Sequence, residues 1–430
     1  MSSFDPKAVL AEQARRGVPA GVVVAIVLSS ICLALFLLLF LAAGRGFFVF
    51  AVPLSFVTLV PMMAGVMALD RLEPEPRYLL AAVLLWGAGS SVVLSLIFEA
   101  LGAITLYATG NSTDTAVAVG VAPVVEETMK ALALFGIFWW RRGQINGITD
   151  GVVYAATTAL GFAAAENIEY YIAAALTGGS ASMGHLFLLR GVMTPFCHPV
   201  FTSMTGLAIG LAVRRKGAAR ALLPVGGLVL AIGLHATWNA LASLGVPGMG
   251  AGMVIVLGAL AGILTAVHAD WKRTVSRIEA CMTAYLPTGL ITRDDIWMLS
   301  TMARRKHARQ WARATHGKVG LAAMSDYQQA CTKLTMLNDR ASFQAVTPAL
   351  FEYQRWALLT LMRFAREAFL APTAAPIMPA AAMPPVFAPP TFAPPVFAPP
   401  AAPPVFAQQP GTPPYPAQPY AGYPPPPPNR

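Results

Sequence analysis

The sequence predicts an all-α membrane protein: a polytopic bundle of about eight spans, a small cytoplasmic helical region and a disordered Pro-rich tail. Of its 430 residues, 56% are hydrophobic and only 12% are charged, whereas soluble proteins carry roughly a quarter charged residues. The mean hydropathy is +0.59. Apolar stretches of the ~20 residues that a span requires recur along the first two thirds of the chain.

Eight such stretches are predicted to be membrane spans. Their approximate limits are 19–44, 46–69, 78–104, 118–140, 150–173, 186–213, 221–244 and 250–268. The first is too long for the apolar core of a cleaved signal peptide, which has about 7–15 residues. We therefore expect it to be retained as the first helix.

The basic residues predict the orientation of the spans. They lie before the first span and after the second, fourth, sixth and eighth, and Arg45 is the exception. This alternation follows the positive-inside rule and places both termini in the cytoplasm of a multi-pass plasma-membrane protein. Because the basic residues lie mostly in these short loops and in the tails, the formal charge of +10 does not indicate a nucleic-acid partner.

Composition divides the chain into four parts. These are a cytoplasmic N-terminal tail (1–18), the transmembrane bundle (19–269), a cytoplasmic helical region (270–371) and the Pro-rich tail (372–430). In the third part, the stretch "MSDYQQACTKLTMLNDRASF" predicts an amphipathic helix. The tail repeats "PPVFA" and "PPTFA", and such a sequence is expected to be extended, either as a solvated tail or as a docking site for a Pro-binding module.

Ionisable and amide side chains inside the spans are the candidate functional residues, because buried charges in membranes are costly and usually functional. The candidates are Glu126, Glu127, Lys130, Glu166, Asn167, Glu169, Arg190, His198, His235, Asn239 and Glu99. At about 1.5 Å per residue from the outer end of each span, Glu126 lies at about 12 Å, Glu166 at about 10 Å, His198 at about 18 Å and His235 at about 13 Å. The four are therefore expected to share one layer in the outer half of the membrane.

Two imidazoles with one or two carboxylates form the ligand set of a catalytic zinc site. A further carboxylate can take a proton from a water molecule and pass it to a leaving amine. Glu126 and Glu127 point about 100° apart on a helix, so one is expected to act as the base and the other to orient or ligate. Lys130 lies one turn away and can neutralise one of them, and Asn239 is one turn from His235, where it can support an oxyanion.

Structural interpretations of the same residues remain open at this point. Glu127 and Lys130 can form an ion pair within one helix, and His235 with Asn239 can hydrogen-bond between helices. Glu169 and Glu99 are expected nearer the outer interface, where a solvated role is favoured. The shared depth of the four central residues favours a site.

Four segments in order resemble the PrsW family of intramembrane proteases, distant relatives of the CAAX-prenyl-protease-like (CPBP) membrane proteins. They are "EETMK" from Glu126, "DGVVYAATTALGFAAAENIEYY" from Asp150, "HPVFTSMTGLAIG" from His198 and "HATWNA" from His235. The resemblance covers about 120 residues in spans four to seven, and leaves out the first two spans, the cytoplasmic region and the tail.

The resemblance implies hydrolysis of a peptide bond of a membrane-anchored protein, near its outer side and within or beside the lipid bilayer, by a metal- or glutamate-activated water. It implies that Glu126 and Glu127 are the catalytic pair, that Glu166, His198 and His235 are the remaining site residues and Zn²⁺ ligands, and that Asn239 supports them. The family also implies an anti-sigma factor as the type of substrate. Two functions of other classes stay open: a proton-coupled secondary transporter that uses the same buried groups, and an inactive scaffold that docks partners through its tail.

Overall fold

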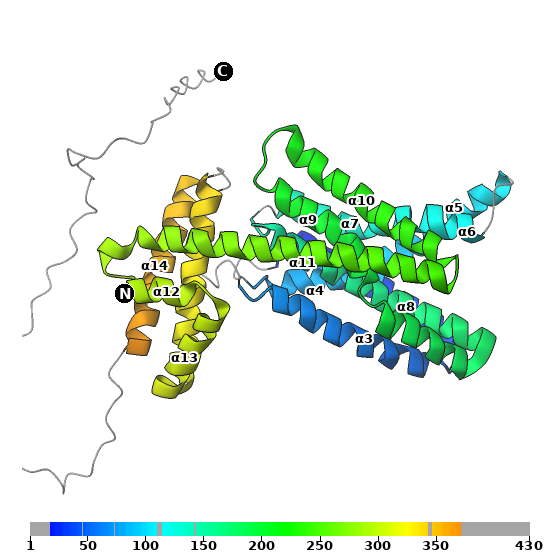
Figure 1. The fold of residues 1–430 in the computed structure, drawn as a ribbon, viewed down its shortest axis with the longest axis horizontal. Helices are drawn as coiled ribbons and strands as arrows, with labels where there is room; N and C mark the ends of the chain where they lie inside the picture. The colour runs from blue at the N-terminus through cyan, green and yellow to red at the C-terminus, as the bar shows by residue number, and fades with distance from the viewer. Residues whose placement is uncertain are drawn as a thin grey trace, which may run out of the picture. The chain divides into compact units, whose positions relative to one another are not determined.

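The computed structural model describes residues 18–44, 46–72, 74–109, 114–141, 143–342 and 346–370. Within these ranges the regular secondary structure is entirely helical (Figure 1). The N-terminal tail to residue 17 and the Pro-rich tail, with its predicted docking motif, lie outside the described residues. The predicted all-α class is therefore confirmed for the part of the chain that the structure covers.

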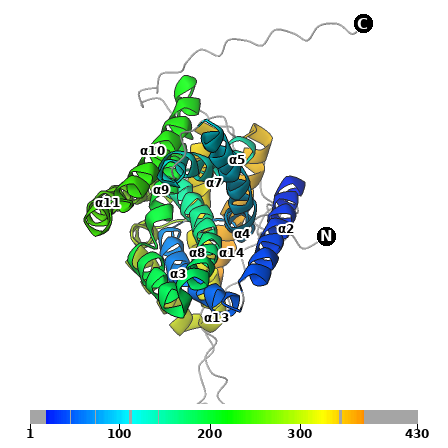
Figure 2. The same cartoon turned by 90° about the vertical axis from the view of Figure 1, so that its right-hand side faces the viewer.

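The bundle is built from long apolar helices joined by short turns. The first part comprises α2 (Ala20–Ala43), α3 (Phe48–Leu69), α4 (Arg77–Trp86), the π-helix η1 (Gly87–Ser91), α5 (Val92–Ala108), α6 (Asp114–Ala116), the π-helix η2 (Val117–Val121) and α7 (Ala122–Trp140). The second part comprises α8 (Ile148–Leu186), the π-helix η3 (Phe187–Met193), α9 (Cys197–Ala212), α10 (Ala218–Ala242) and α11 (Val246–Thr283). Figure 2 shows α8 in the middle of the bundle, with α2 and α11 on opposite flanks.

The expected count of eight spans is not confirmed. Among the described residues, six helical stretches are long and apolar enough to cross a membrane. They are Ala20–Ala43, Phe48–Leu69, Arg77–Ala108, Ile148–Ala212, Ala218–Ala242 and Val246–Thr283. The expected span 118–140 is absent from this set because α7 carries three charged residues, and the expected spans 150–173 and 186–213 fall in one helical run of 65 residues.

Glycines allow α8 and α9 to lie in direct backbone contact at the centre of the bundle. A Cβ atom added at Gly151 would meet the carbonyl oxygen of Gly206 at 2.1 Å, and one added at Gly206 would meet that of Gly151 at 2.2 Å. Small residues permit such close helix packing in membranes, and the "GLAIG" segment supplies them on α9. Gly179, at φ +71°, interrupts α8 before the chain turns back through η3 toward α9.

A second hydrophobic core lies beyond the end of α11. It joins the last turns of α11 to the 3-10 turn η4 (Leu286–Thr288), α12 (Arg293–Leu299), α13 (Met302–Ser342) and α14 (Pro348–Leu370). The expected amphipathic helix is part of α13, which buries Met324, Tyr327, Cys331, Leu334 and Leu337 at helical spacing. Figure 1 shows α12 to α14 gathered at one end of the bundle.

Charged contacts attach this helical region to the loops at that end of the bundle. Asp339 accepts from Arg277 Nη1 at 3.2 Å and from Arg214 Nη2 at 3.5 Å. Arg340 Nη1 donates to the carbonyl of Gly143 at 3.3 Å. The loops after α7 and α9, which the sequence places on the same side of the membrane, therefore meet one helical region.

Candidate functional site

The two adjacent glutamates lie near the start of α7, just after the π-helical turn η2 (Val117–Val121). Wide π-helical turns occur frequently at functional sites because they change the direction of the following side chains. Glu126 and Glu127 are 5% and 1% exposed, and Lys130 is fully buried. Three charged side chains are thus enclosed within one turn of an apolar helix.

Lys130 joins both carboxylates and extends to a second helix. Its Nζ donates to Glu126 Oε2 at 3.0 Å and to Glu127 Oε1 at 2.9 Å. The same Nζ lies 3.1 Å from Nδ1 of His198 on α9 and 3.9 Å from the centre of the Phe162 ring. A lysine that contacts two carboxylates, an imidazole and an aromatic face holds α7, α8 and α9 in one register.

Glu127 has a hydrogen-bond partner at each of its carboxylate oxygens. Oε1 lies 3.2 Å from Nδ1 of His235 on α10, in addition to its contact with Lys130. Oε2 accepts from Thr202 Oγ1 at 2.8 Å. The ring of His235 also stacks on Phe201, with 4.8 Å between centroids. Glu127 is therefore a fixed, fully bonded group that connects α7 to α9 and α10.

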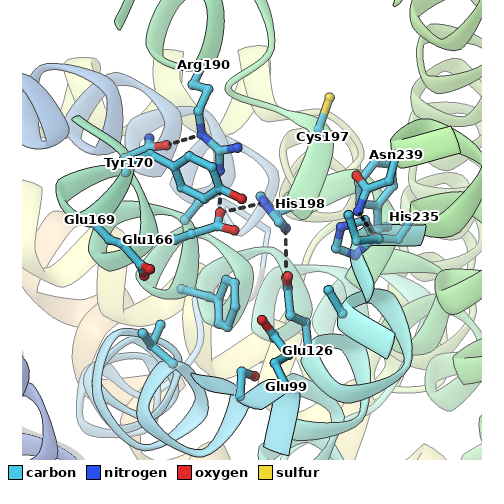
Figure 3. Close-up of a pocket in the computed structure, with 18 of the residues that line it drawn as sticks. Glu99, Glu126, Glu166, Glu169, Tyr170, Arg190, Cys197, His198, His235 and Asn239 are labelled. Atoms are coloured by element: carbon cyan, nitrogen blue, oxygen red, sulfur yellow. Dashed lines mark hydrogen bonds and ion pairs between the residues drawn. The ribbon is translucent and has the colours of Figure 1, made fainter. Parts of the chain in front are cut away.

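Glu166 on α8 is the centre of a second charged group. Its Oε2 lies 2.9 Å from His198 Nε2 and also accepts from Arg190 Nη2 of η3. Arg190 Nε donates to Asn167 Oδ1 at 2.9 Å, and its guanidinium lies 4.0 Å from the centre of the Tyr170 ring. His198 connects the two groups, because its Nδ1 lies 3.1 Å from Lys130 Nζ. Its Nε2 faces Glu166 (Figure 3).

A cavity of about 360 Å³ opens onto this layer and is lined by residues of α3, α5, α7, α8, η3, α9 and α10. Glu126, Glu166, His198, His235 and Asn239 line it. Its volume is in the range of pockets that bind small ligands or short segments of chain. Figure 1 shows the end of α5, which contributes to the lining, at the end of the bundle away from α12 to α14.

Some of the predicted site residues line this cavity and others do not. Glu127 and Lys130 are absent from the cavity lining and lie behind Glu126. Asn239 lines the cavity, but its Nδ2 donates to the carbonyl of Ala118 at 2.8 Å. Asn167 also lines the cavity, and its Oδ1 accepts from Arg190 Nε at 2.9 Å.

Four of these residues can hold a metal ion. One ligand atom from each of Glu126, Glu127, His198 and His235 lies within 4.8 Å of the other three. Two imidazoles and two carboxylates match the donor types of catalytic zinc sites, so the donor set fits such an ion. Glu166, which the resemblance also implies as a ligand, is outside this group and pairs with Arg190 instead.

Sequence reasoning gave no role to Arg190 or Thr202, and both contact site residues. An arginine in the apolar segment "LLRG" is a signal in its own right, because an intramembrane charge needs a partner. Thr202 is one helical turn after His198, so it lies on the same face of the helix. The sequence alone does not show that Arg190 pairs with Glu166 or that Thr202 donates to Glu127.

Comparison with known proteins gives two matches. The model of the PrsW family, described as PrsW family intramembrane metalloprotease, matches residues 75–267. A protein named Protease PrsW, from Shouchella clausii (strain KSM-K16), is 30% identical over 115 residues, which are 27% of this chain and 49% of that protein. The match thus spans about half the length of that relative. No solved structure matches the chain.

The matched residues contain every motif of the predicted resemblance and every residue of the candidate metal group. They begin just before α4 and end within α11, so they also contain the helices that line most of the cavity. Residues 75–267 of this chain therefore match the PrsW family of intramembrane metalloproteases, as the motifs predicted.

Proposed function

We propose that this chain is an intramembrane endopeptidase that hydrolyses a peptide bond of a membrane-anchored protein in the cavity beside Glu126. The observation that carries the proposal is the position of Glu126. It lines a cavity of about 360 Å³ together with His198 and His235, inside the segment that matches an intramembrane protease family.

Glu126 is the proposed general base, because Glu127 lies behind it and has both carboxylate oxygens bonded. A water molecule in the cavity would give its proton to Glu126 while its oxygen attacks the carbonyl carbon of the peptide bond. Glu126 would then pass the proton to the leaving amine as the carbon–nitrogen bond breaks.

A metal ion, with zinc as the proposed identity, would be held by His198 and His235 with carboxylate support from the α7 pair. When bound, such an ion polarises the carbonyl and lowers the pKa of a water ligand. Glu166 has a positioning role in this scheme, since it holds His198 Nε2 at 2.9 Å and is itself held by Arg190.

The remaining predicted residues orient this machinery. Lys130 fixes the carboxylates of Glu126 and Glu127 by hydrogen bonds of 3.0 and 2.9 Å. Asn239 retains one amide N–H beyond the one given to Ala118, and that N–H can donate to the oxyanion that forms on the substrate carbonyl. Asn167 supports the site indirectly through Arg190.

The wider setting is part of the proposal. We propose that both termini and the region 270–371 lie in the cytoplasm. The bundle 19–269 would lie in the plasma membrane, with the cavity in the outer half of the membrane. The substrate would be a single-span protein cut near its outer side, such as an anti-sigma factor. The contact of Arg214 with Asp339 and the contact of Arg340 with the Gly143 carbonyl support one common side for the loops after α7 and α9.

The test uses purified full-length protein in liposomes with fluorogenic single-span peptides. Cleavage by the wild type and its loss in Glu126→Gln would support the proposal, with Glu352→Gln in α14 as an exposed carboxylate control. General acid–base catalysis contributes about 10²–10⁴ in rate, so a Glu126→Gln variant that retains more than a tenth of wild-type activity would contradict the proposal.

A further inference from the structure

The lining of the cavity is strongly acidic. Five carboxylates line it, whereas Arg190 is the single lysine or arginine among the described lining residues. The carboxylates belong to Glu99, Asp114, Glu126, Glu166 and Glu169. Arg190 forms an ion pair with Glu166, and Lys130, which does not line the cavity, forms one with Glu126. The other three carboxylates of the lining form no ion pair with a described lysine or arginine.

Two of these carboxylates have no role in the proposed reaction. Glu99 on α5 and Glu169 on α8 are both half-buried and form no hydrogen bond or ion pair with residues that the structure describes. Glu99 is repelled by both Glu166 and Glu169, against one attraction to the Lys130 ammonium. Like charges near one another in a low-dielectric setting repel strongly, so a cation is the ligand that this part of the cavity favours.

Ser95 supplies an independent indication of a ligand at the same place. It lines the cavity, is only 2% exposed, and its Oγ has no hydrogen-bond partner in the described structure. Ser95 and Glu99 are one helical turn apart on α5 and therefore lie on one face. Buried hydroxyls nearly always have a partner, so the Ser95 hydroxyl beside Glu99 lacks a partner that a ligand in the cavity could supply.

We propose that Ser95, Glu99 and Glu169 form a subsite that binds a lysine or arginine side chain of the substrate. This inference rests on the proposed function, since it assigns the substrate class of that same cavity. An ammonium or guanidinium group has several donors, which suit two carboxylates and one hydroxyl. Glu169 is one turn after Glu166 on α8, so the subsite adjoins the reacting groups and would fix the cleaved bond relative to the basic residue (Figure 3).

Lysine and arginine are the residues most suited to reach such a subsite from a membrane segment. Their long apolar stems lie along hydrophobic surface while the charged group extends to a polar region. A basic residue at the flank of a single-span substrate could therefore enter the acidic cavity while the neighbouring peptide bond reaches Glu126.

The experiment uses a library of single-span peptides with randomised residues at the outer flank, incubated with full-length protein in liposomes. Mass spectrometry of the products gives the frequency of each residue at each position relative to the cleaved bond. For the wild type we expect lysine and arginine to exceed alanine about tenfold at one position, the size of one charge-assisted hydrogen bond. For Glu99→Gln/Glu169→Gln we expect a ratio below about two.

This ratio does not depend on the amount of folded enzyme, so a variant that folds poorly still reports on specificity. Ser95→Ala is expected to lower the ratio partially, Glu99→Lys to favour glutamate at that position, and Glu352→Gln to leave the ratio unchanged. Cleavage without any basic preference would overturn the subsite and leave the protease intact. Absence of cleavage in wild type and Glu126→Gln alike would overturn the protease itself, and a metal ion lost specifically in Glu99→Gln/Glu169→Gln would show that the subsite binds a metal instead.

Discussion

Replacing Lys130 by methionine tests the central contact of the site. Methionine has a similar length and no charge, so the change removes the ammonium with little change in volume. Glu126 and Glu127 would then lose their contacts of 3.0 and 2.9 Å with Nζ, and His198 Nδ1 would lose its contact of 3.1 Å. Two carboxylates that are 5% and 1% exposed would remain in the bundle.

The expected cost follows from this geometry. Removing one partner of a buried ion pair costs about 3–5 kcal/mol, because the remaining charge is left without compensation. Glu127 keeps Thr202 and His235 as partners, and Glu126 faces the cavity. We therefore expect the lower end of that range, about 3 kcal/mol in the free energy of unfolding.

Unfolding by SDS in mixed micelles, followed by tryptophan fluorescence, measures this change. The control is Lys272→Met, which removes an exposed lysine of α11 and is expected to change stability by less than about 0.5 kcal/mol. In the double variant Lys130→Met/Glu127→Gln, the losses should not add, and the interaction energy should exceed about 1 kcal/mol. Strict additivity, or a Lys130→Met variant as stable as the control, would refute the proposed burial of this charge network.

Three further predictions concern the metal, a hydrogen bond and the packing. Elemental mass spectrometry should find close to one zinc per wild-type chain and almost none in His198→Ala/His235→Ala, and equal content in both would exclude these ligands. Thr202→Val should lower cleavage about tenfold through the lost hydrogen bond to the Glu127 carboxylate, and an unchanged rate would show that this bond is dispensable. Gly206→Val should reduce the free energy of unfolding by more than about 2 kcal/mol, because the backbone contact cannot accommodate a side chain. The control Gly233→Ala, where nothing lies within 4 Å, should be tolerated. Equal losses of stability in SDS unfolding would contradict the packing argument.

The position of the site could be predicted because the membrane makes charges rare. Glu126, His198 and His235 are costly in a membrane unless they share a site. The helical rise per residue predicts that they lie in one layer. The structure brings them to one cavity from α7, α9 and α10. The close contact of α8 with α9 depends on Gly206, where a Cβ atom would meet the backbone of Gly151.

Partner selection among the charges could not be predicted. Helical spacing allowed Lys130 to pair with either glutamate, and the structure shows that it contacts both. The preference of Glu166 for Arg190 depends on the turn of the chain through η3, which has no periodic signal. The count of eight spans is not confirmed for a related reason, since hydropathy does not show where a charged helix such as α7 belongs or where a continuous helical run turns back.

The place of Lys130 determines how a metal can bind. Its Nζ contacts three of the four residues that could hold an ion, namely Glu126, Glu127 and His198. Zinc–oxygen and zinc–nitrogen distances are about 2.0–2.2 Å, so an ion on these atoms would lie within a few ångströms of the ammonium and repel it. An ion bound to these atoms would therefore compete with the lysine contacts that the structure shows.

Lys130→Met should accordingly bind zinc more tightly than the wild type, by at least about tenfold if the repulsion exceeds about 1.4 kcal/mol. Competition with a fluorescent chelator measures both affinities on purified protein, and Lys272→Met should match the wild type. Equal affinities for Lys130→Met and the wild type would mean that the ion binds where the lysine does not reach. The glutamate pair and Lys130 would then form a separate proton-handling group beside the metal.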